Sequence, residues 1–361
     1  MALQEYRCPC CGGSIEFNST VGKMKCPYCD SEFEMDSLKD IDQALDNEEP
    51  ESMKWADYDG QSWGGEDMEG MASYHCKSCG AEIITAETTG ASSCPYCGNP
   101  IVMMQTFSGA LKPEFIIPFK LDKEAAKAAL AKHFQGKKLL PSAFSSQNHI
   151  DEVNGVYVPF WLFNSGASAN IRYKATKVKR WSDNDYNYKE TKYYTVVRDG
   201  SLFFENIPVD GSKKMDDDLM DSLEPFDFKE EKEFMTAYLS GYLADKYDVT
   251  AEESVERANL RIKNSTVAKF RSTVKDYDTV ETENANIQLH DGSYKYGLLP
   301  MWILNTSWNG QKFVFGMNGQ TGKFVGDLPM DKGKFWKYFL MYFAISALIV
   351  FVIAYFLLTN Q

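Results

Sequence analysis

The chain has 361 residues, of which 44% are hydrophobic and 14% aromatic, enough for one sizeable core with smaller modules beside it. Its net charge of −13 is local, because residues 1–75 hold 17 acidic against 5 basic side chains while residues 76–361 hold 34 against 33. Phosphate contacts need clustered Lys and Arg, so this charge argues against a nucleic-acid-binding protein. No apolar stretch opens the sequence, and we therefore expect no signal peptide and a cytoplasmic N-terminus.

Eight of the nine cysteines form two sets with the same spacing, C-x2-C-x14-C-x2-C, at an offset of 68 residues. A C-x2-C turn directs two thiolates at one metal ion, and four thiolates satisfy the tetrahedral preference of zinc. The spacing predicts two structural zinc ions with no open coordination position. The predicted ligands are Cys8, Cys11, Cys26 and Cys29 in the first set, and Cys76, Cys79, Cys94 and Cys97 in the second.

Several readings of the cysteines stay open beside this one. Cys10 is a bystander or a backup ligand, because the second set has no spare cysteine. Iron could replace zinc, since both accept four thiolates. A redox role or disulfides are weaker alternatives, because a reducing compartment normally uses such pairs for metal. Gly12, Gly80 and Gly98 follow the turns, where a positive φ is often required.

The first part of the chain divides into three predicted segments. Residues 1–35 and 72–105 are the two zinc ribbons, and residues 36–71 lie between them. Residues 32–71 contain 14 acidic side chains and only Lys39 and Lys54 as bases, which predicts a flexible acidic linker. It is a solvated spacer or a docking segment for a basic partner, with Trp55 and Trp63 able to form short apolar patches.

Residues 106–330 are predicted to form a mixed α+β domain with a mainly antiparallel sheet. Alanine-rich residues 122–133 predict a helix, and residues 226–274 predict a helical segment whose second helix is capped by Thr250 and Glu253. Predicted strands span residues 156–164, 171–181, 188–198, 201–207, 299–307, 311–317 and 323–327. Two Asn-Gly steps, at residues 309 and 318, are expected to supply positive φ in tight turns.

A weaker internal repeat lies within this domain. The pattern P-x-W-x-x-N occurs at Pro159 and again at Pro300, an offset of 141 residues. Two related halves of the sheet would explain it, and chance similarity between two aromatic strands is the alternative. Proline at the same place in both segments favours edge strands or strand starts.

Residues 335–358 are predicted to form a single transmembrane helix. Residues 339–358 carry no charge over 20 positions, and at about 1.5 Å per residue such a helix crosses the hydrocarbon core. Lys332, Lys334 and Lys337 precede it and Trp336 lies where aromatic belts form. We expect a single-pass protein of the cell membrane with a cytoplasmic N-terminus, inserted after the rest of the chain is made.

Catalytic motifs do not emerge from the sequence. Residues 316–323 resemble a phosphate-binding loop, but five residues separate Gly316 from Gly322 and Phe324 stands where such a loop has Ser or Thr. The four histidines are treated as ordinary residues. We therefore predict no enzyme, no catalytic residue, no organic cofactor and no small-molecule substrate. The basic strand at residues 172–180 is a solvated face, an anionic lipid contact or a weak nucleic-acid patch.

The order of these features resembles bacterial TFIIB-type zinc-ribbon-containing membrane proteins of the YdjG kind. The resemblance covers essentially the whole chain, including Tyr238-Leu-Ser-Gly-Tyr242 and Asn318-Gly-Gln-Thr-Gly-Lys323. It implies an adaptor that recruits PspA-type or SPFH-type proteins to the membrane under envelope stress. Metal-clamped ribbons on an acidic tether agree with protein docking, and a membrane-tethered nucleic-acid-binding protein is the alternative.

Overall fold

A computed structural model describes residues 15–19, 22–27, 32–34, 53–56, 60–64, 67, 69–89, 91, 93–104, 111–141, 144, 153–309 and 311–359. Its helices are α2 (Lys123–Phe134), α4 (Asp217–Ser222), α5 (Ala251–Ser272) and α6 (Lys332–Thr359), with 3₁₀ turns at Phe228–Glu230 and Thr236–Leu239. Its strands are β1 (Glu16–Asn18), β2 (Lys23–Lys25), β3 (Glu32–Phe33), β4 (Met71–His75), β5 (Glu82–Ala86), β6 (Val102–Met104), β7 (Phe115–Ile116), β8 (Asn154–Ser182), β9 (Asn187–Asp210), β10 (Lys232–Glu233), β11 (Leu243–Asp245), β12 (Thr279–Trp308), β13 (Gln311–Asn318) and β14 (Phe324–Gly326).

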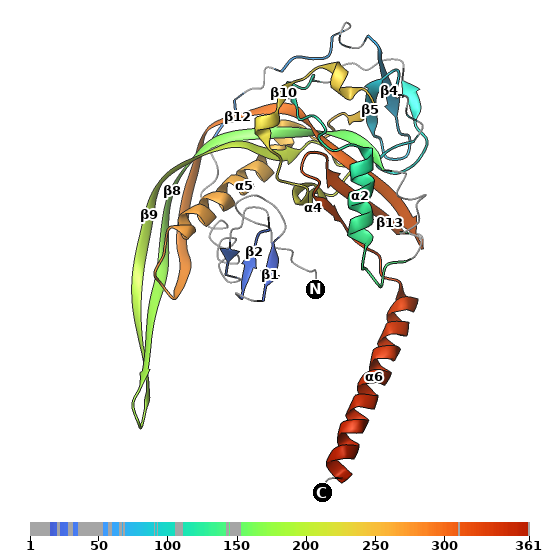
Figure 1. The fold of residues 1–361 in the computed structure, drawn as a ribbon. Coiled ribbons are helices and arrows are strands. Elements are labelled where there is room, and N and C mark those ends of the chain that lie inside the picture. The colour runs from blue at the N-terminus through green and yellow to red at the C-terminus, as the bar shows by residue number, and fades with distance from the viewer. Residues whose placement is uncertain are drawn as a thin grey trace.

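Within these described ranges, β1–β3 form a small antiparallel sheet and the other strands form one 11-stranded sheet in the order β10-β7-β12-β8-β11-β5-β4-β6. β9 pairs with β8, and β13 pairs with β12 and β14. Nearly all pairings are antiparallel, the exceptions being β11 with β8 and β7 with β12. The prediction of a mixed α+β fold with a mainly antiparallel sheet is confirmed. Figure 1 shows β8, β9 and β12 curving around α5.

The sheet contains two halves of the same plan. The first half runs β7, α2, β8 and β9, and the second runs β11, α5, β12 and β13. The halves exchange parts, since β7 pairs with β12 of the second half and β11 pairs with β8 of the first. The helices exchange as well: Ile262 and Phe270 of α5 pack against β8 and β9, while Leu130 and Phe134 of α2 pack against β12 and β13. Each half thus completes the core of the other.

The P-x-W-x-x-N segments lie at the centre of this arrangement as antiparallel neighbours, with Val158 opposite Leu299. Their prolines are buried in central strands, so the edge-strand interpretation is wrong. Pro159 lies where the partner of β8 changes from β11 to β9, and Pro300 lies where the partner of β12 changes from β7 to β13. A missing N–H is tolerated there because no ladder bond requires it. Each carbonyl accepts a hydrogen bond, from Gly211 N–H at 2.9 Å and from Gly319 N–H at 2.8 Å.

The predicted helices are confirmed where a cap supports them. Asp122 accepts from the Ala125 N–H at the start of α2, and Thr250 with Glu253 forms a complete capping box on α5. The segment before Thr250 is not helical, which corrects the first part of the helical prediction for residues 226–274. Phe234, Tyr238 and Tyr242 recur at helical spacing, but they lie in a 3₁₀ turn and in loops that pack on one core cluster beside β7 and β11.

Parts of the predicted flexible linker are packed on the sheet. Trp55 contacts Phe163 edge to face at 5.0 Å between ring centroids, and Trp63 contacts Phe234 at 5.6 Å. The Ala56 N–H donates to Gly292 O, at a glycine where a Cβ would meet the Trp55 ring at 2.8 Å. The aromatic patches therefore outweigh the acidic composition for residues 53–56 and 60–64, and the other linker residues mostly lie outside the described ranges.

The expected positive φ is found at Asn309, with φ +51°, but not at the second Asn-Gly step. There the left-handed residue is Gly322, and buried Asn318 instead accepts from the N–H groups of Gln320 and Thr321. The Asn318 side chain also donates to Leu223 O and Pro225 O. This turn is thus an Asx-type structure fixed by a buried amide.

Helix α6 leaves the body of the molecule as a single exposed rod (Figure 1). Its segment Lys332–Tyr355 is 24 residues long, apolar enough to span a membrane, and not buried against the rest of the protein. The start of α6 is fixed to the loop after α2, since the Asp331 N–H donates to Leu139 O and Lys334 Nζ to Leu140 O. A helix that is apolar on all sides is normally buried, either in a protein core or in a membrane.

Candidate metal centre

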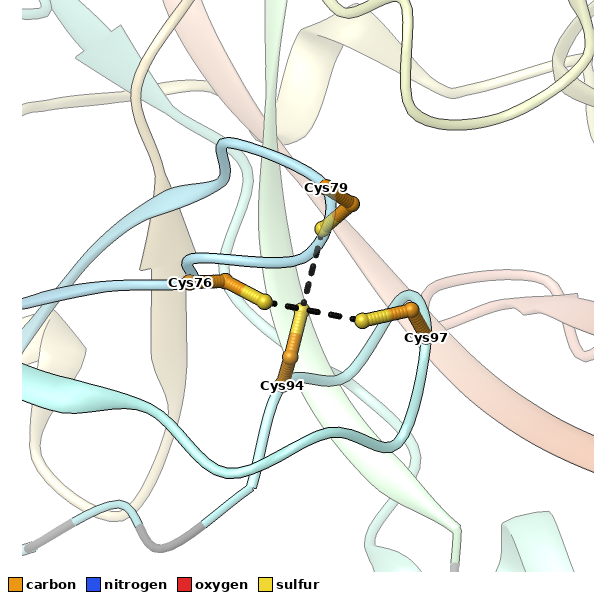
Figure 2. Close-up of side chains that lie close together, drawn as sticks. All are labelled: Cys76, Cys79, Cys94 and Cys97. Atoms are coloured by element: carbon orange, nitrogen blue, oxygen red, sulfur yellow. Dashed lines mark hydrogen bonds between the residues drawn. The ribbon is translucent and has the colours of Figure 1, made fainter.

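The second cysteine set converges on one point. The four sulfurs of Cys76, Cys79, Cys94 and Cys97 lie within 4.8 Å of one another, with Cys76 to Cys97 at 3.5 Å and Cys79 to Cys94 at 3.6 Å (Figure 2). A tetrahedral zinc with bonds of about 2.3 Å requires sulfurs roughly 3.8 Å apart. A disulfide requires about 2.05 Å, which excludes bonded pairs. The cluster therefore has the donors and the spacing for one zinc ion.

Two matching turns hold these cysteines. In each, the N–H of the first cysteine donates five residues ahead, from Cys76 to Ala81 O and from Cys94 to Asn99 O, both at 2.8 Å. A glycine then donates back to the first cysteine, from Gly80 to Cys76 O and from Gly98 to Cys94 O, both at 2.9 Å. These glycines have φ of +76° and +72°, as the sequence predicted. A side chain at either position would strain the turn.

The thiols differ in how readily they ionise. Burial raises the pKa of Cys94 and of the neighbouring Cys79. Burial acts in the same direction on Cys97, but hydrogen bonds from the Asn99 backbone and amide and from neighbouring thiols lower its pKa to about 6. The Asn99 amide donates to Cys97 Sγ at 3.4 Å and to Ser78 Oγ at 2.9 Å. Asn99 thus orients Cys97 and favours its thiolate, a role that the cysteine spacing does not indicate.

The cysteine turns are anchored to the sheet by a buried polar network. Tyr96, between the last two cysteines, donates to Asp245 Oδ2 of β11 at 2.9 Å. Ser212 donates to the same oxygen at 3.0 Å, and Lys214 Nζ lies 3.4 Å from it. Complete burial raises the pKa of Asp245 to about 6, against the opposing effect of Lys214. Strand β5 also pairs with β11, so this ribbon is continuous with the 11-stranded sheet.

The first cysteine set lies largely outside the described residues. Cys26 is buried directly after β2, while Cys8, Cys10, Cys11 and Cys29 fall outside the described ranges. The hairpin β1–β2 before Cys26 turns at Gly22, with φ +68°. The zinc ion of the first cysteine set therefore stays a prediction. The division of the chain into separate domains also stays a prediction.

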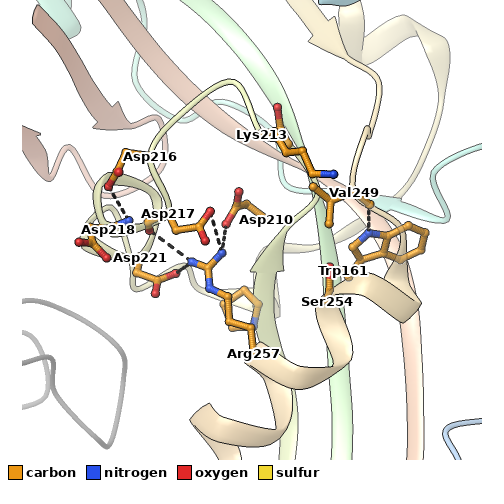
Figure 3. Close-up of polar contacts among 12 residues, drawn as sticks. Trp161, Asp210, Lys213, Asp216, Asp217, Asp218, Asp221, Val249, Ser254 and Arg257 are labelled. Carbon is orange, nitrogen blue, oxygen red and sulfur yellow. Dashed lines mark hydrogen bonds and ion pairs between the residues drawn. The ribbon is translucent and has the colours of Figure 1, made fainter.

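A second polar cluster lies where α4, α5 and the end of β9 meet (Figure 3). Arg257 bonds Asp210 at 2.7 Å and Asp221 at 2.5 Å, and its Nη1 lies 3.1 Å from Asp217. Arg261 forms a bidentate pair with Glu224 at 2.9 and 2.7 Å. Burial raises the pKa of Asp210 to about 6, although Arg257 opposes the shift. Two arginines of α5 thus face four carboxylates, and their ion pairs join α5 to α4 and to the end of β9.

His290, treated as ordinary in the sequence analysis, lies between two polar groups. Its Nε2 is 3.1 Å from Ser168 Oγ and its Nδ1 is 2.8 Å from Asp291 Oδ2. This is the order of groups in a hydrolytic triad, but the side chains of His290 and Asp291 are 46% and 82% exposed. Ser168 also bonds Ser201 at 3.0 Å, which makes these residues part of a solvated polar ladder.

Fold and centre together define a mixed α+β protein with a four-cysteine cluster built into a large sheet and an exposed apolar helix at its C-terminal end. The chain belongs to the YdjG family. It is 34% identical over 329 residues to the uncharacterized protein YdjG of Bacillus subtilis (strain 168), an alignment that covers 91% of each chain. No family model matches the chain, and no solved structure matches it.

Proposed function

We propose that this chain is a membrane-anchored zinc-ribbon adaptor that recruits cytoplasmic partner proteins to the cell membrane. The observation that carries the proposal is the separation of its two ends, since β4 and β5 lie at the end of the body opposite to α6 (Figure 1). With α6 in the bilayer as a single span, the cysteine centre faces the cytoplasm. Lys332, Lys334 and Lys337 at the start of α6 support a cytoplasmic N-terminus through the positive-inside rule.

The cysteine ribbon supplies a docking edge for such a partner. Among the described strands, β6 is last in the sheet order, beyond β4. Its Val102 and Met103 are 49% and 63% exposed. An edge strand with exposed apolar side chains is a template for an added partner strand. A zinc ion held by four thiolates would stiffen this edge and perform no hydrolysis, because it leaves no position for water.

The partner class comes from the family resemblance of the sequence, which implies PspA-type or SPFH-type envelope-stress proteins. The experiment is co-purification of the tagged full-length chain from native membranes, with bound proteins identified by mass spectrometry. Met103→Lys should lose the partner while keeping its metal and its membrane fraction, because a charge blocks strand addition. Met235→Lys is the matched control, since Met235 is 55% exposed near the opposite edge.

Three outcomes would each reject one part of the proposal. Both variants could retain the same partners as the wild type, which would remove β6 as the docking edge. The Cys29→Ser, Cys97→Ser double variant could lose no partner, which would remove the ribbons from binding. The purified chain could retard single-stranded DNA in a salt-sensitive manner, which would favour the nucleic-acid alternative.

A further inference from the structure

The end of the β8–β9 hairpin extends beyond the rest of the sheet. β8 and β9 pair continuously to Ser182 and Asn187, whereas β12 begins at Thr279, opposite Thr176. The last buried inner-face residue of β8 is Ala175, 1% exposed. Residues 177–192, here called the overhang, are therefore a two-stranded ribbon of six residue pairs, about 20 Å long. A two-stranded ribbon of this kind is only marginally stable by itself, so its surface is a candidate for a binding role.

The inner face of the overhang carries aromatic and basic side chains. This face continues that of buried Tyr173 and Ala175, and next presents Lys177, Lys179 and Trp181. Trp181 stacks on Tyr188 of β9 with ring centroids 5.5 Å apart and planes at 11°, and Lys179 Nζ lies 5.5 Å from the Trp181 ring centroid. Trp181 and Tyr188 are nevertheless 46% and 40% exposed. The stack is a preformed amphipathic surface.

The basic charges of the overhang are mostly unpaired. It holds five bases against Asp183, Asp185 and Glu190. Asp183 is already occupied, because it accepts from the N–H groups of Asp185 and Tyr186 and from the Tyr188 hydroxyl, and these bonds lower its pKa. Glu190 lies 3.5 Å from Lys192. Within the described part of the chain, no carboxylate lies within ion-pair distance of the remaining bases: Lys177, Lys179, Arg180 and Lys189.

We propose that the overhang is a second membrane contact, which places its inner face on anionic phospholipid headgroups. The overhang and α6 extend from the same side of the body, and the inner face of the curved hairpin is turned toward the side of α6 (Figure 1). Trp and Tyr favour the membrane–water interface, and Lys is attracted to the anionic cytoplasmic leaflet. The inference rests on the proposed function only in taking α6 as the anchor. Two contacts would fix the orientation of the body relative to the membrane more firmly than the single span does.

The test uses the full chain in lipid nanodiscs whose acyl chains are brominated, because bromine quenches nearby tryptophan. The wild type, Trp181→Phe and Trp336→Phe are compared in phosphatidylcholine alone and with phosphatidylglycerol. The fluorescence of Trp181 is the difference between the wild type and Trp181→Phe. It should be quenched with phosphatidylglycerol at low salt, and not at high salt or in phosphatidylcholine alone. The fluorescence of Trp336, obtained in the same way from Trp336→Phe, should be quenched in every disc, because Trp336 lies at the start of the anchor. Failure of the anchor is thus distinguishable from failure of the overhang.

A charge variant provides the second arm of the experiment. Lys177→Gln, Lys179→Gln should lose most of the lipid-dependent quenching of Trp181 while that of Trp336 is retained. Lys229→Gln, Lys232→Gln removes the same charge from exposed positions near β10 and should change neither. Quenching of Trp336 without any of Trp181 would overturn the proposal. A Trp181 response to added single-stranded DNA but not to anionic lipid would also overturn it and assign the overhang to nucleic acid.

Discussion

The two halves of the sheet follow one plan but differ in the length of their hairpins. The returning strand has 24 residues in β9 and 8 in β13. The covering helix, supplied by the other half, differs in the same direction, with 22 residues in α5 and 12 in α2. The longer hairpin therefore packs against the longer helix, and the shorter hairpin against the shorter one. The overhang is the part of β8 and β9 that α5 does not cover.

The halves also differ at their flanks. Beyond β11 the sheet continues into β5, β4 and β6 with their cysteine cluster, whereas beyond β7 the last of the described strands is β10, with two residues. The residue that ends the returning strand is charged in one half and neutral in the other. Asp210 is paired with Arg257, while Asn318 bonds only backbone groups. Each difference can be tested by a substitution.

The largest effect is expected from the flank that carries the cysteines. Cys94→Ser removes a buried ligand and should abolish zinc at the second set, destabilising the protein by several kcal/mol. Elemental analysis and denaturant unfolding measure this, and hydrogen exchange should show lost protection in β4, β5 and β11 but not in β7 and β10. Cys10→Ser is the control and should retain the metal of the second set. Unchanged metal content and unfolding midpoint in Cys94→Ser would refute the metal centre.

The next effect tests the exchange of helices. Ile262→Ala in α5 and Leu130→Ala in α2 each create a cavity at a fully buried site, which should cost about 2–5 kcal/mol. Because each helix covers the hairpin of the other half, Ile262→Ala should increase exchange in β9 and Leu130→Ala in β13. Hydrogen exchange with mass spectrometry reads both strands in one experiment. An equal increase of hydrogen exchange in β9 and β13 in both variants would mean that each helix does not protect one hairpin separately from the other.

A smaller, pH-dependent effect is expected at Asp210. Burial raises its folded pKa from 3.8 to about 6, so the folded state binds this proton more tightly than the unfolded state does. The stability it contributes is present below about pH 4 and is lost as pH rises through 6. Asp210→Asn does not titrate, so the stability of the wild type relative to the variant should fall by up to about 3 kcal/mol over this range.

Denaturant unfolding of the full chain at a series of pH values checks this sign. Asp217→Asn is the matched control, because Asp217 pairs with the same arginine but its side chain is 62% exposed. Because this variant keeps Asp210, its own stability should still fall over the same pH range. A wild type that gains stability over Asp210→Asn between pH 4 and 6 would contradict the assigned direction of the pKa shift.

The sequence predicted those features whose physics is local. Cysteine spacing, the Thr250–Glu253 capping box and the apolar run of α6 each act over a few residues, and the structure retains them. Periodicity alone failed at Phe234, Tyr238 and Tyr242, because apolar residues four apart also occur where short turns and strands pack on one core. The first part of β12 was missed, although Val280, Ala285, Ile287 and Leu289 are its inward-facing residues.

The remaining features depend on contacts between distant residues. Tyr96 and Asp245 are 149 residues apart, and nothing in either neighbourhood indicates their hydrogen bond. The exchange of helices is equally hidden, since the repeat at Pro159 and Pro300 indicates two halves but not which helix covers which hairpin. The basic strand at residues 172–180 was read as one surface. The sheet divides it, with Lys174 on the outer face paired to Glu283 at 3.0 Å and Lys177 on the inner face.

The smallest effect is expected at the two prolines, where the halves are most alike. Pro159→Ala and Pro300→Ala each add an N–H where the neighbouring strand changes, and each frees the unfolded chain, so both should destabilise by about 1 kcal/mol. Equal values, measured by denaturant unfolding, would indicate that the two positions are equivalent in energy as well as in topology. A loss confined to Pro159→Ala would show that the junction of β11, β8 and β9 carries more of the fold than that of β7, β12 and β13. In that case the two positions would be alike in sequence and topology but not in energy, and the overhang would extend from the half that contributes more to the stability of the sheet.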